Sequence, residues 1–390
     1  MNYTLAQRMS RLGTETAFEV MAKAKKLEAQ GKEIIHLEIG EPDFTTPEHI
    51  KDAAIKALKD GKTGYCPAPG IPELRAAIAE DAGKRRAVTF KPEQVVVTPG
   101  AKPIIFYTVL AVVETDDEVL IPNPAYPIYD SIVQFVGGKP VYYTLREELE
   151  FRLDLDEFES LITPRTRLAI LGYPENPTGA HLGKEILAKI VELALKHHFF
   201  ILADEVYLNM LYDEIFTSIA SFPGMLEQTI VLDSFSKTYA MTGWRIGYGI
   251  FPEAWVEPVT KLIINSVSCT SHFSQYGAIE ALRGPQDAVV KMAAEFRKRR
   301  DFIVRRLNEM QGISCVMPHG AFYVFPNIKK LGIASRDMEA RLLQEAGVAA
   351  LTGTAFGSQG EGYIRLSYAN SMENIEKALN RIEEFIAKKS

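Results

Sequence analysis

The sequence predicts an α/β fold: a mostly parallel sheet flanked by helices, with a smaller α+β domain attached. From about Glu93 to Gly249, short β-branched or apolar runs alternate with stretches long enough for helices. Such alternation is typical of a parallel sheet with helices on both faces. Runs such as Val95–Val97 and Phe200–Leu202 are also continuously apolar, which indicates strands that are buried on both sides.

The expected strands follow one another through the middle of the chain. Helix-length stretches, such as Ile104–Val113 and Lys184–His197, separate several of them. The expected strands are Gln94–Thr98, Glu118–Ile121, Pro140–Thr144, Leu168–Leu171, Phe199–Ala203, Ile230–Leu232 and Ile246–Ile250.

The C-terminal part has a different pattern. A long helical pattern covers Asp287–Met310, and two strand-like runs follow at Gly320–Phe325 and Tyr363–Ser367. The end of the chain carries an apolar stripe with the spacing of an amphipathic helix. Its members are Ile375, Leu379, Ile382 and Ile386. We therefore expect a large domain over residues 46–284 and a small α+β domain formed by residues 1–45 together with residues 285–390.

Composition excludes several classes of function. The chain has 390 residues, 47% of them apolar, and a net charge of −6 from 44 basic and 50 acidic residues. That length favours two domains, and that charge disfavours a general nucleic-acid binder. The seven histidines show no H-E-x-x-H spacing, so we expect no metal site.

The expected location is the cytoplasm. No apolar run approaches the roughly 20 residues that span a bilayer, and residues 1–13 lack the apolar core of a secretory signal. The three cysteines, Cys66, Cys269 and Cys315, are widely spaced and odd in number. They form no disulfide framework, which suits a reducing compartment.

Residues with reactive or ligand-type side chains come directly after the expected strands. Gly100-Ala101-Lys102 follows the first strand, and Asn176, Asp204 and Lys237 follow three later ones. Because the carboxyl ends of parallel strands share one edge of a sheet, where ligands bind, we expect these segments to converge.

Lys237 is the most informative of these residues. Hydroxyl residues flank it, and Arg245 follows eight positions later. Such a lysine can form a Schiff base with an aldehyde, while Arg245, Ser234 and Ser236 suit a phosphate. An aldehyde and a phosphate on one ligand describe pyridoxal phosphate, a cofactor that largely dictates the chemistry.

The other strand-end residues fit the same cofactor. Asp204 would pair with the pyridine nitrogen, and Tyr207 and Asn176 could bond the phenolic oxygen of the ring. Free backbone N–H groups from Gly100 to Lys102, at a helix N-terminus, suit the phosphate, and Tyr126 could stack on the ring. Taken singly, each has an ordinary interpretation as a turn, an ion pair or a surface residue. Their joint occurrence at successive strand ends favours the cofactor.

These residues belong to a set of motifs by which the chain resembles the class I/II aminotransferases of pyridoxal-phosphate fold type I, most nearly the aspartate aminotransferase group. The resemblance covers nearly the whole chain. The motifs are Gly40-Glu41-Pro42-Asp43-Phe44, Gly64-Tyr65, Gly70-Ile71-Pro72-Glu73-Leu74-Arg75, Asn176-Pro177-Thr178-Gly179, Asp204-Glu205-Val206-Tyr207, Ser236-Lys237, Gly243-Trp244-Arg245-Ile246-Gly247 and Gly362-Tyr363-Ile364-Arg365-Leu366-Ser367-Tyr368-Ala369.

The resemblance implies a ping-pong transfer of an amino group from an L-amino acid to a 2-oxo acid. It implies that Lys237 is the Schiff-base lysine and proton shuttle, with a pKa lowered by its surroundings. Arg365 would bind the substrate α-carboxylate, assisted by Asn176 and the backbone at Gly40. Tyr65 would reach the phosphate of a neighbouring subunit, so the active sites would be shared within a homodimer.

The resemblance leaves the substrate open. Lys102 matches a lysine that contacts the distal carboxylate of the substrate in related aspartate enzymes. Where those enzymes carry serine and threonine, however, this chain has Glu15 and Ala17, with Phe18 nearby. A carboxylate there would repel an acidic side chain, so aspartate or glutamate and alanine or aromatic donors all stay possible. The alternative activity is a carbon-sulfur lyase or another elimination enzyme on the same fold.

Overall fold

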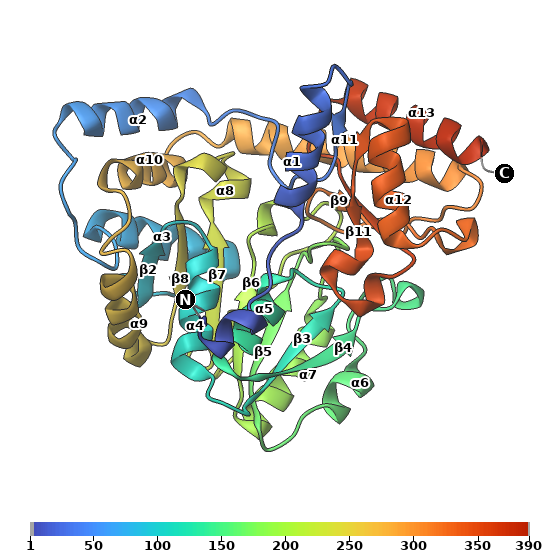
Figure 1. Cartoon of the computed structure of the whole chain (residues 1–390). Helices are drawn as coiled ribbons and strands as arrows, with labels where there is room; N and C mark the ends of the chain where they lie inside the picture. The colour runs from blue at the N-terminus through green and yellow to red at the C-terminus, as the bar shows by residue number, and fades with distance from the viewer. Residues whose placement is uncertain (1–3, 389–390) are drawn as a thin grey trace.

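A seven-stranded sheet forms the centre of the molecule in a computed structural model that describes residues 4–388 (Figure 1). The strand order is β2-β8-β7-β6-β5-β3-β4, and only β8 runs antiparallel to its neighbours. The predicted α/β class is thus confirmed, and each predicted strand lies within two residues of an observed one. The strands are β2 (Val95–Thr98), β3 (Glu118–Asn123), β4 (Lys139–Thr144), β5 (Thr166–Gly172), β6 (Phe200–Asp204), β7 (Thr229–Ser234) and β8 (Gly247–Ile250).

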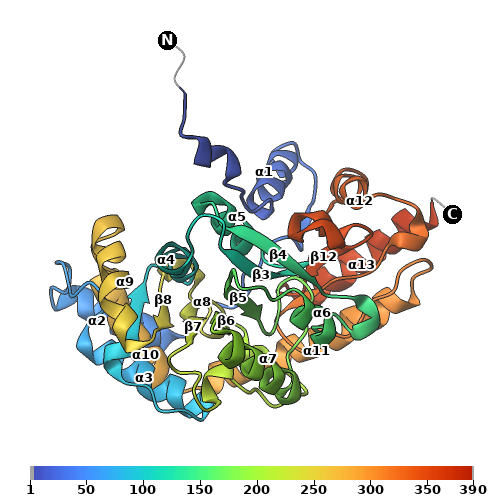
Figure 2. The same cartoon turned by 90° about the horizontal axis from the view of Figure 1, so that it is seen from below.

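Alternate residues of the central strands pack into two different hydrophobic cores. Ile170 of β5 and Leu202 of β6 face a core that includes α4 (Lys102–Val112), α5 (Ile128–Val136) and α9 (Glu253–Ser266). The neighbouring residues of the same strands face a core that includes α7 (Lys184–His197). In Figure 2, α4 and α5 accordingly lie on one side of the sheet and α7 on the other. Burial on both faces explains why these strands are continuously apolar.

Further helices cover the β2 and β8 end of the sheet. A third core joins β2, β8 and part of β7 to α3 (Pro72–Arg86) and α10 (His272–Arg283), and α10 in turn packs on α2 (Glu48–Lys59). Two short helices complete this part of the chain: α6 (Leu155–Ser160) and α8 (Phe235–Thr238).

The C-terminal part is built around small strands and longer helices. Antiparallel β9 (Tyr323–Val324), β12 (Ile364–Ser367) and β11 (Leu351–Thr352) form one sheet, and β1 (Ile35–His36) pairs with β10 (Val348–Ala349). The pairing of β1 with β10 joins an N-terminal segment to this part of the molecule. The division into residues 46–284 and residues 1–45 with 285–390 stays a prediction. The helices here are α1 (Ala17–Glu28), α11 (Asp287–Glu309), α12 (Ser335–Arg341) and α13 (Met372–Ala387).

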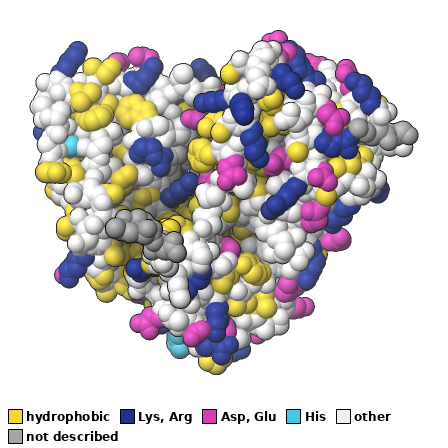
Figure 3. Space-filling view, in the orientation of Figure 1, with side chains coloured by type: hydrophobic (Ala, Val, Ile, Leu, Met, Phe, Trp, Pro, Cys, Tyr) yellow, Lys and Arg dark blue, Asp and Glu magenta, His cyan; other side chains and the backbone are white. Residues whose placement is uncertain are grey.

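The visible face of the molecule carries hydrophobic patches as well as charged side chains of both signs (Figure 3). Basic and acidic side chains are interspersed over the part of the face in Figure 3 that carries α11 to α13. Within residues 4–388, no helix is both long and apolar enough to cross a membrane.

Candidate active site

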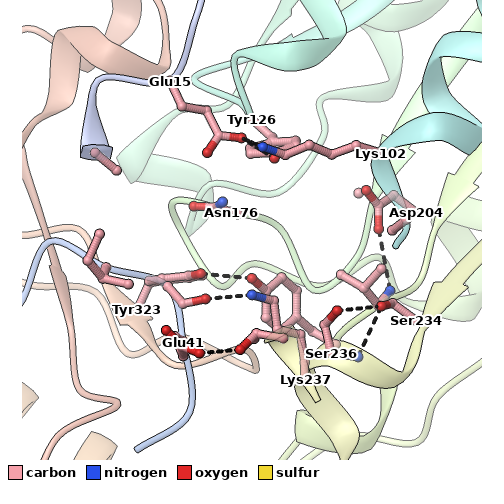
Figure 4. A pocket seen from close by; sticks show the side chains of 18 of the residues that line it. Glu15, Glu41, Lys102, Tyr126, Asn176, Asp204, Ser234, Ser236, Lys237 and Tyr323 are labelled. Atoms are coloured by element: carbon pink, nitrogen blue, oxygen red, sulfur yellow. Dashed lines mark hydrogen bonds and ion pairs between the residues drawn. The ribbon is translucent and has the colours of Figure 1, made fainter. Parts of the chain in front are cut away.

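A cavity of about 540 Å³ lies beyond the carboxyl ends of β5, β6 and β7. The structure brings most of the predicted site residues to its wall, from segments far apart in the sequence (Figure 4). Only Gly100 and Tyr65 of that set do not line it. The predicted residues on the wall are Gly40, Ala101, Lys102, Tyr126, Asn176, Asp204, Tyr207, Ser234, Ser236, Lys237, Arg245 and Arg365.

Strand ends and a single helical turn position the central residues. Asp204 is the last residue of β6 and Ser234 the last of β7. Ser234 caps the short helix α8, because its hydroxyl accepts a hydrogen bond from the N–H of Ser236 at 3.0 Å. This cap turns the chain so that Lys237, one residue further on, faces the cavity.

The side chain of Lys237 is half-buried at the cavity wall. Its amine donates a hydrogen bond to the carbonyl oxygen of Gly40 at 2.5 Å. Burial lowers the pKa of Lys237 from 10.5 to about 8, and the charge of Arg365 lowers it further while Glu41 opposes the change. The expected lowering of this pKa is confirmed, and a large share of the amine is neutral near pH 8.

Asp204 is a buried carboxyl group at the opposite wall. The phenol of Tyr129 donates a hydrogen bond to its Oδ2 at 2.7 Å. Burial raises the pKa of Asp204 to about 6, the bond from Tyr129 opposes this, and the charges of Asp233 and Glu205 add to it. Tyr129 was not predicted from the sequence, although it lies three residues after Tyr126 and so on the same face of a helical turn.

Arg245 lies against Gly100 at the start of α4. Its guanidinium donates to the carbonyl oxygens of Thr242 at 2.7 Å and Pro99 at 3.3 Å, so its partners within residues 4–388 are backbone groups rather than carboxylates. Gly100 has φ +86°, and a Cβ on it would come within 2.1 Å of Arg245 Nη2. Gly100 therefore lies behind the cavity wall and allows Arg245 to approach the helix terminus.

Arg365 enters the cavity from β12. Its Nη1 donates to Oδ1 of Asn176 at 3.0 Å, its Nη2 donates to the carbonyl oxygen of Glu38, and its Cζ lies 4.3 Å from the ring centroid of Tyr323. The buried Nε atom has no hydrogen-bond partner among the described residues. Arg365 and Asn176, which we expected to act together on the substrate α-carboxylate, thus lie next to each other, and that role stays a prediction.

Two tyrosines and Gly40 lie beside Arg365. The hydroxyls of Tyr207 and Tyr323 are 2.8 Å apart. A Cβ on Gly40 would come within 2.1 Å of the Tyr323 hydroxyl, so a glycine is needed for this close approach. Tyr323 was missed from the sequence because nothing in its local pattern distinguishes it from a strand residue.

The far end of the cavity carries a compensated charge pair. Glu15 Oε1 lies 2.7 Å from the amine of Lys102, and it also accepts a hydrogen bond from the phenol of Tyr126 (Figure 4). The Lys102 amine lies 5.9 Å from the ring centroids of both Phe18 and Tyr126. Ala17 also borders this region, as do Glu41 and Thr242, which the sequence did not single out.

Tyr65 lies outside the cavity of its own chain. Its side chain is 89% exposed, and it borders a separate hollow next to Cys269–Phe273. Its expected contact with a second subunit stays a prediction.

Comparison with known proteins identifies the family. The model of the family described as aminotransferase class I and II matches residues 32–382. The chain is 45% identical to aromatic-amino-acid aminotransferase 2 of Thermococcus litoralis over 366 residues, which cover 93% of this chain and 94% of that one. It is 43% identical to the aspartate aminotransferase of Pyrococcus abyssi over 362 residues, which cover 92% and 93% of the two chains.

A solved structure shows the same backbone. The aspartate aminotransferase of Thermus thermophilus with maleate superimposes with a TM-score of 0.94 at 37% identity, covering 98% of this chain and 100% of that one. The fold and cavity thus define an α/β protein with a candidate site at the carboxyl edge of its sheet. The chain belongs to the aminotransferase class I and II family, and it is an aminotransferase that acts on small amino and oxo acids.

Proposed function

We propose that this aminotransferase uses pyridoxal 5'-phosphate and favours L-amino acid donors with neutral, aromatic or small apolar side chains. The observation that carries the proposal is the arrangement of Lys237, Asp204 and Arg365 around one cavity, with Glu15 paired to Lys102 at its far end.

The residues present fit the cofactor in charge and in donor type. Arg245 keeps its charge free of carboxylates and lies at the N-terminus of α4, where backbone N–H groups favour an anion such as a phosphate. Ser234 and Ser236 line the same wall. Asp204, at another wall, supplies the carboxylate that a protonated ring nitrogen requires.

When bound, the cofactor supplies an electron sink for the bonds of the substrate Cα. Lys237 would hold the cofactor covalently and then, as a free amine, move the proton on and off the substrate Cα. Its lowered pKa suits this work because a general base must be neutral near the working pH. Asn176 and Tyr207 would orient the ring through hydrogen bonds, and Tyr126 would lie against its face.

Arg365 would hold the α-carboxylate of the substrate. Its guanidinium already lies on the ring of Tyr323 and bonds Asn176, which fixes its plane for a two-point interaction. Asn176 and the backbone of Gly40 border the same part of the cavity. The substrate would therefore be oriented before its Cα reaches Lys237.

The side chain of the substrate would extend toward Glu15 and Lys102. Because these two charges neutralise each other, a substrate with a distal carboxylate finds no free cation there. Phe18, Ala17 and Tyr126 offer apolar surface instead. This favours a neutral donor, while an acidic acceptor such as 2-oxoglutarate would have to displace Glu15 from Lys102.

We also propose a homodimer in which Tyr65 of each subunit completes the site of the other. The support is its position: a tyrosine that is 89% exposed and outside its own cavity is placed to contact a second copy.

An absorbance titration tests the proposal. The purified protein, reconstituted with pyridoxal 5'-phosphate, should show a band in the near-ultraviolet or visible range that phenylalanine or alanine shifts more readily than aspartate. Product analysis with 2-oxoglutarate then tests whether elimination accompanies amino-group transfer. Formation of glutamate from phenylalanine or alanine reports amino-group transfer, whereas ammonia released without glutamate from a donor that carries a leaving group on Cβ, such as cysteine, would report elimination. A protein that binds no cofactor contradicts the proposal.

A further inference from the structure

We propose that Arg86 is a positioning residue of the active site, which acts through Glu205 and Asp233 on Asp204 and on the turn that carries Lys237. This inference rests on the proposed function, because it concerns how Asp204 meets the ring nitrogen of the cofactor. Arg86 itself lies outside the cavity wall and touches neither substrate nor cofactor.

Arg86 is the last residue of α3, and its side chain is completely buried between two carboxylates. Its Nε donates to Oε2 of Glu205 at 2.5 Å, and its Nη2 donates to Oδ2 of Asp233 at 2.8 Å. A guanidinium buried in this way is locked in place, since breaking either ion pair would leave a charge uncompensated in the interior.

Uncharged groups donate further hydrogen bonds to both carboxylates. Glu205 Oε1 accepts from the hydroxyls of Tyr173 at 2.7 Å and Ser218 at 2.6 Å. Asp233 accepts from the hydroxyl of Tyr248 at 2.9 Å and from the backbone N–H of Ser234 at 2.6 Å. Of the nitrogen atoms of Arg86, Nη1 alone lacks a partner among the described residues.

Each carboxylate is the sequence neighbour of an active-site residue. Glu205 directly follows Asp204 at the end of β6, and Asp233 directly precedes Ser234 at the end of β7. One guanidinium therefore fixes the ends of two adjacent strands. The hydrogen bond from Ser234 N–H to Asp233 also fixes the position of Ser234, which caps α8, the helix that contains Lys237. A displacement of Arg86 would be transmitted to both walls of the site.

The charge of Arg86 matters as well as its position. Three carboxyl groups interact electrostatically with Asp204: Glu205 on its own segment, Asp233 on β7, and the buried Glu175 after β5. The phenol of Tyr129 on α5 is a neutral donor, and the amine of Lys237 borders the same cavity. Arg86 directly compensates two of these carboxylates. Its removal would make protonation of Asp204 easier, and a protonated Asp204 cannot pair with a protonated ring nitrogen.

The test compares two ligands that differ only at the ring nitrogen. Pyridoxal 5'-phosphate and its analogue with carbon in place of that nitrogen are titrated into the cofactor-free enzyme, and the ratio of their dissociation constants is measured. Arg86→Gln should lower the preference for the natural cofactor about tenfold at pH 5 and about twofold at pH 7, the effects of a one-unit rise in the pKa of Asp204 from about 6. Arg86→Lys, which keeps the charge, should retain most of the preference.

Opposite charge changes should have opposite effects. Asp233→Asn and Glu205→Gln each remove a negative charge and should lower the pKa of Asp204. The pH at which the enzyme loses its preference for pyridoxal 5'-phosphate over the analogue should therefore fall in these variants and rise in Arg86→Gln. A role limited to stability would weaken both ligands by the same factor in every variant, and that result overturns the inference. If Arg86→Gln does not fold, the two carboxylate variants decide the question through this pH shift.

Two controls separate the possible failures. Arg75 lies on the same helix and donates to backbone carbonyls of Val95 and Glu93, so Arg75→Gln should lower stability without changing the ligand ratio. Asp204→Asn should abolish the preference for the ring nitrogen. If it does not, the proposed role of Asp204 fails. If it does while Arg86→Gln leaves the ratio unchanged, only the role of Arg86 fails.

Discussion

At the scale of single residues, the amine of Lys237 lowers the stability of the cofactor-free protein within a defined pH window. Its pKa is 10.5 when exposed and about 8 in the folded chain. Below pH 8 the amine is protonated in both states, and the folded state is destabilised by up to about 3 kcal/mol. Between the two values the unfolded state binds more protons, so the stability should rise with pH until the effect disappears above the higher value.

Lys237→Met should therefore stabilise the cofactor-free protein at pH 7 while removing activity. Urea unfolding at pH 7 should give a higher free energy of unfolding for the variant. The difference from the unmodified protein should shrink as the pH rises toward 10.5, the pKa of the exposed amine. Turnover should fall by about a thousandfold or more, as expected for loss of the group that moves the proton. A variant that kept full turnover would exclude Lys237 as the catalytic base.

A second prediction at this scale concerns the partner of Lys102. Glu15→Gln removes the carboxylate that neutralises the Lys102 amine at 2.7 Å. The value of kcat/KM for aspartate relative to phenylalanine should rise about tenfold, which corresponds to an interaction of about 1.4 kcal/mol. Steady-state assays with both donors measure this ratio.

Glu41→Gln is the matched control for Glu15→Gln. Glu41 also lines the cavity, but it accepts a hydrogen bond from Thr242 rather than pairing with Lys102. The variant Glu41→Gln should leave the ratio of kcat/KM for aspartate to kcat/KM for phenylalanine unchanged. An equal change in both variants would mean that the net charge of the cavity, and not the pair at Lys102, decides the preference.

The residues that the sequence could predict are those with a recognisable local context. Lys237 and Asp204 follow apolar strands, and their position at one sheet edge can be inferred from topology. Arg86 could not be predicted, because its partners lie 119 and 147 residues away and its own surroundings resemble the basic end of an ordinary helix. Whether Glu15 faces the cavity also depends on packing between distant segments.

At the scale of elements, the turn between β2 and α4 depends on one glycine. Gly100→Ala introduces both a strained φ of +86° and a contact of 2.1 Å with Arg245 Nη2. We expect a loss of about 1–2 kcal/mol in stability and an increase of tenfold or so in the dissociation constant of pyridoxal 5'-phosphate, measured by absorbance titration.

Gly31→Ala separates the two causes of the Gly100 effect. Gly31 also has φ +86°, but no atom of the described residues lies within 4 Å of a Cβ built on it. Gly31→Ala should lose a similar amount of stability, because of backbone strain, and its affinity for pyridoxal 5'-phosphate should be unchanged. If both variants weakened the cofactor equally, the contact with Arg245 would not be responsible.

Elements buried on both faces were the easiest to predict. The strands of the large sheet are apolar throughout and lie between helices, so their order and their approximate ends follow from pattern alone. Strands β1, β10 and β11 have two residues each, which is too short for any periodicity to appear. The run Gly320–Phe325 was expected to be a strand, but only Tyr323–Val324 pairs with β12.

At the scale of the whole molecule, the exposed Tyr65 predicts sites shared between two subunits. Lys237→Ala and Tyr65→Ala proteins should each be nearly inactive at limiting cofactor. After unfolding and joint refolding, half of the dimers are hybrids with one intact site, so activity should return to about a quarter of the unmodified level. Sedimentation velocity should show a dimer throughout. Absence of any gain on mixing would place Tyr65 at the site of its own subunit or at none.

Glu15 lies in an irregular segment just before α1, outside the sheet and outside every helix. We therefore expect substitutions at this position to alter which donors the enzyme accepts without disturbing the framework that performs the reaction. Relatives named for aspartate, alanine and aromatic substrates share this backbone closely. A change of substrate within such a family would then need few mutations, in a short N-terminal stretch where we expect them to cost little stability.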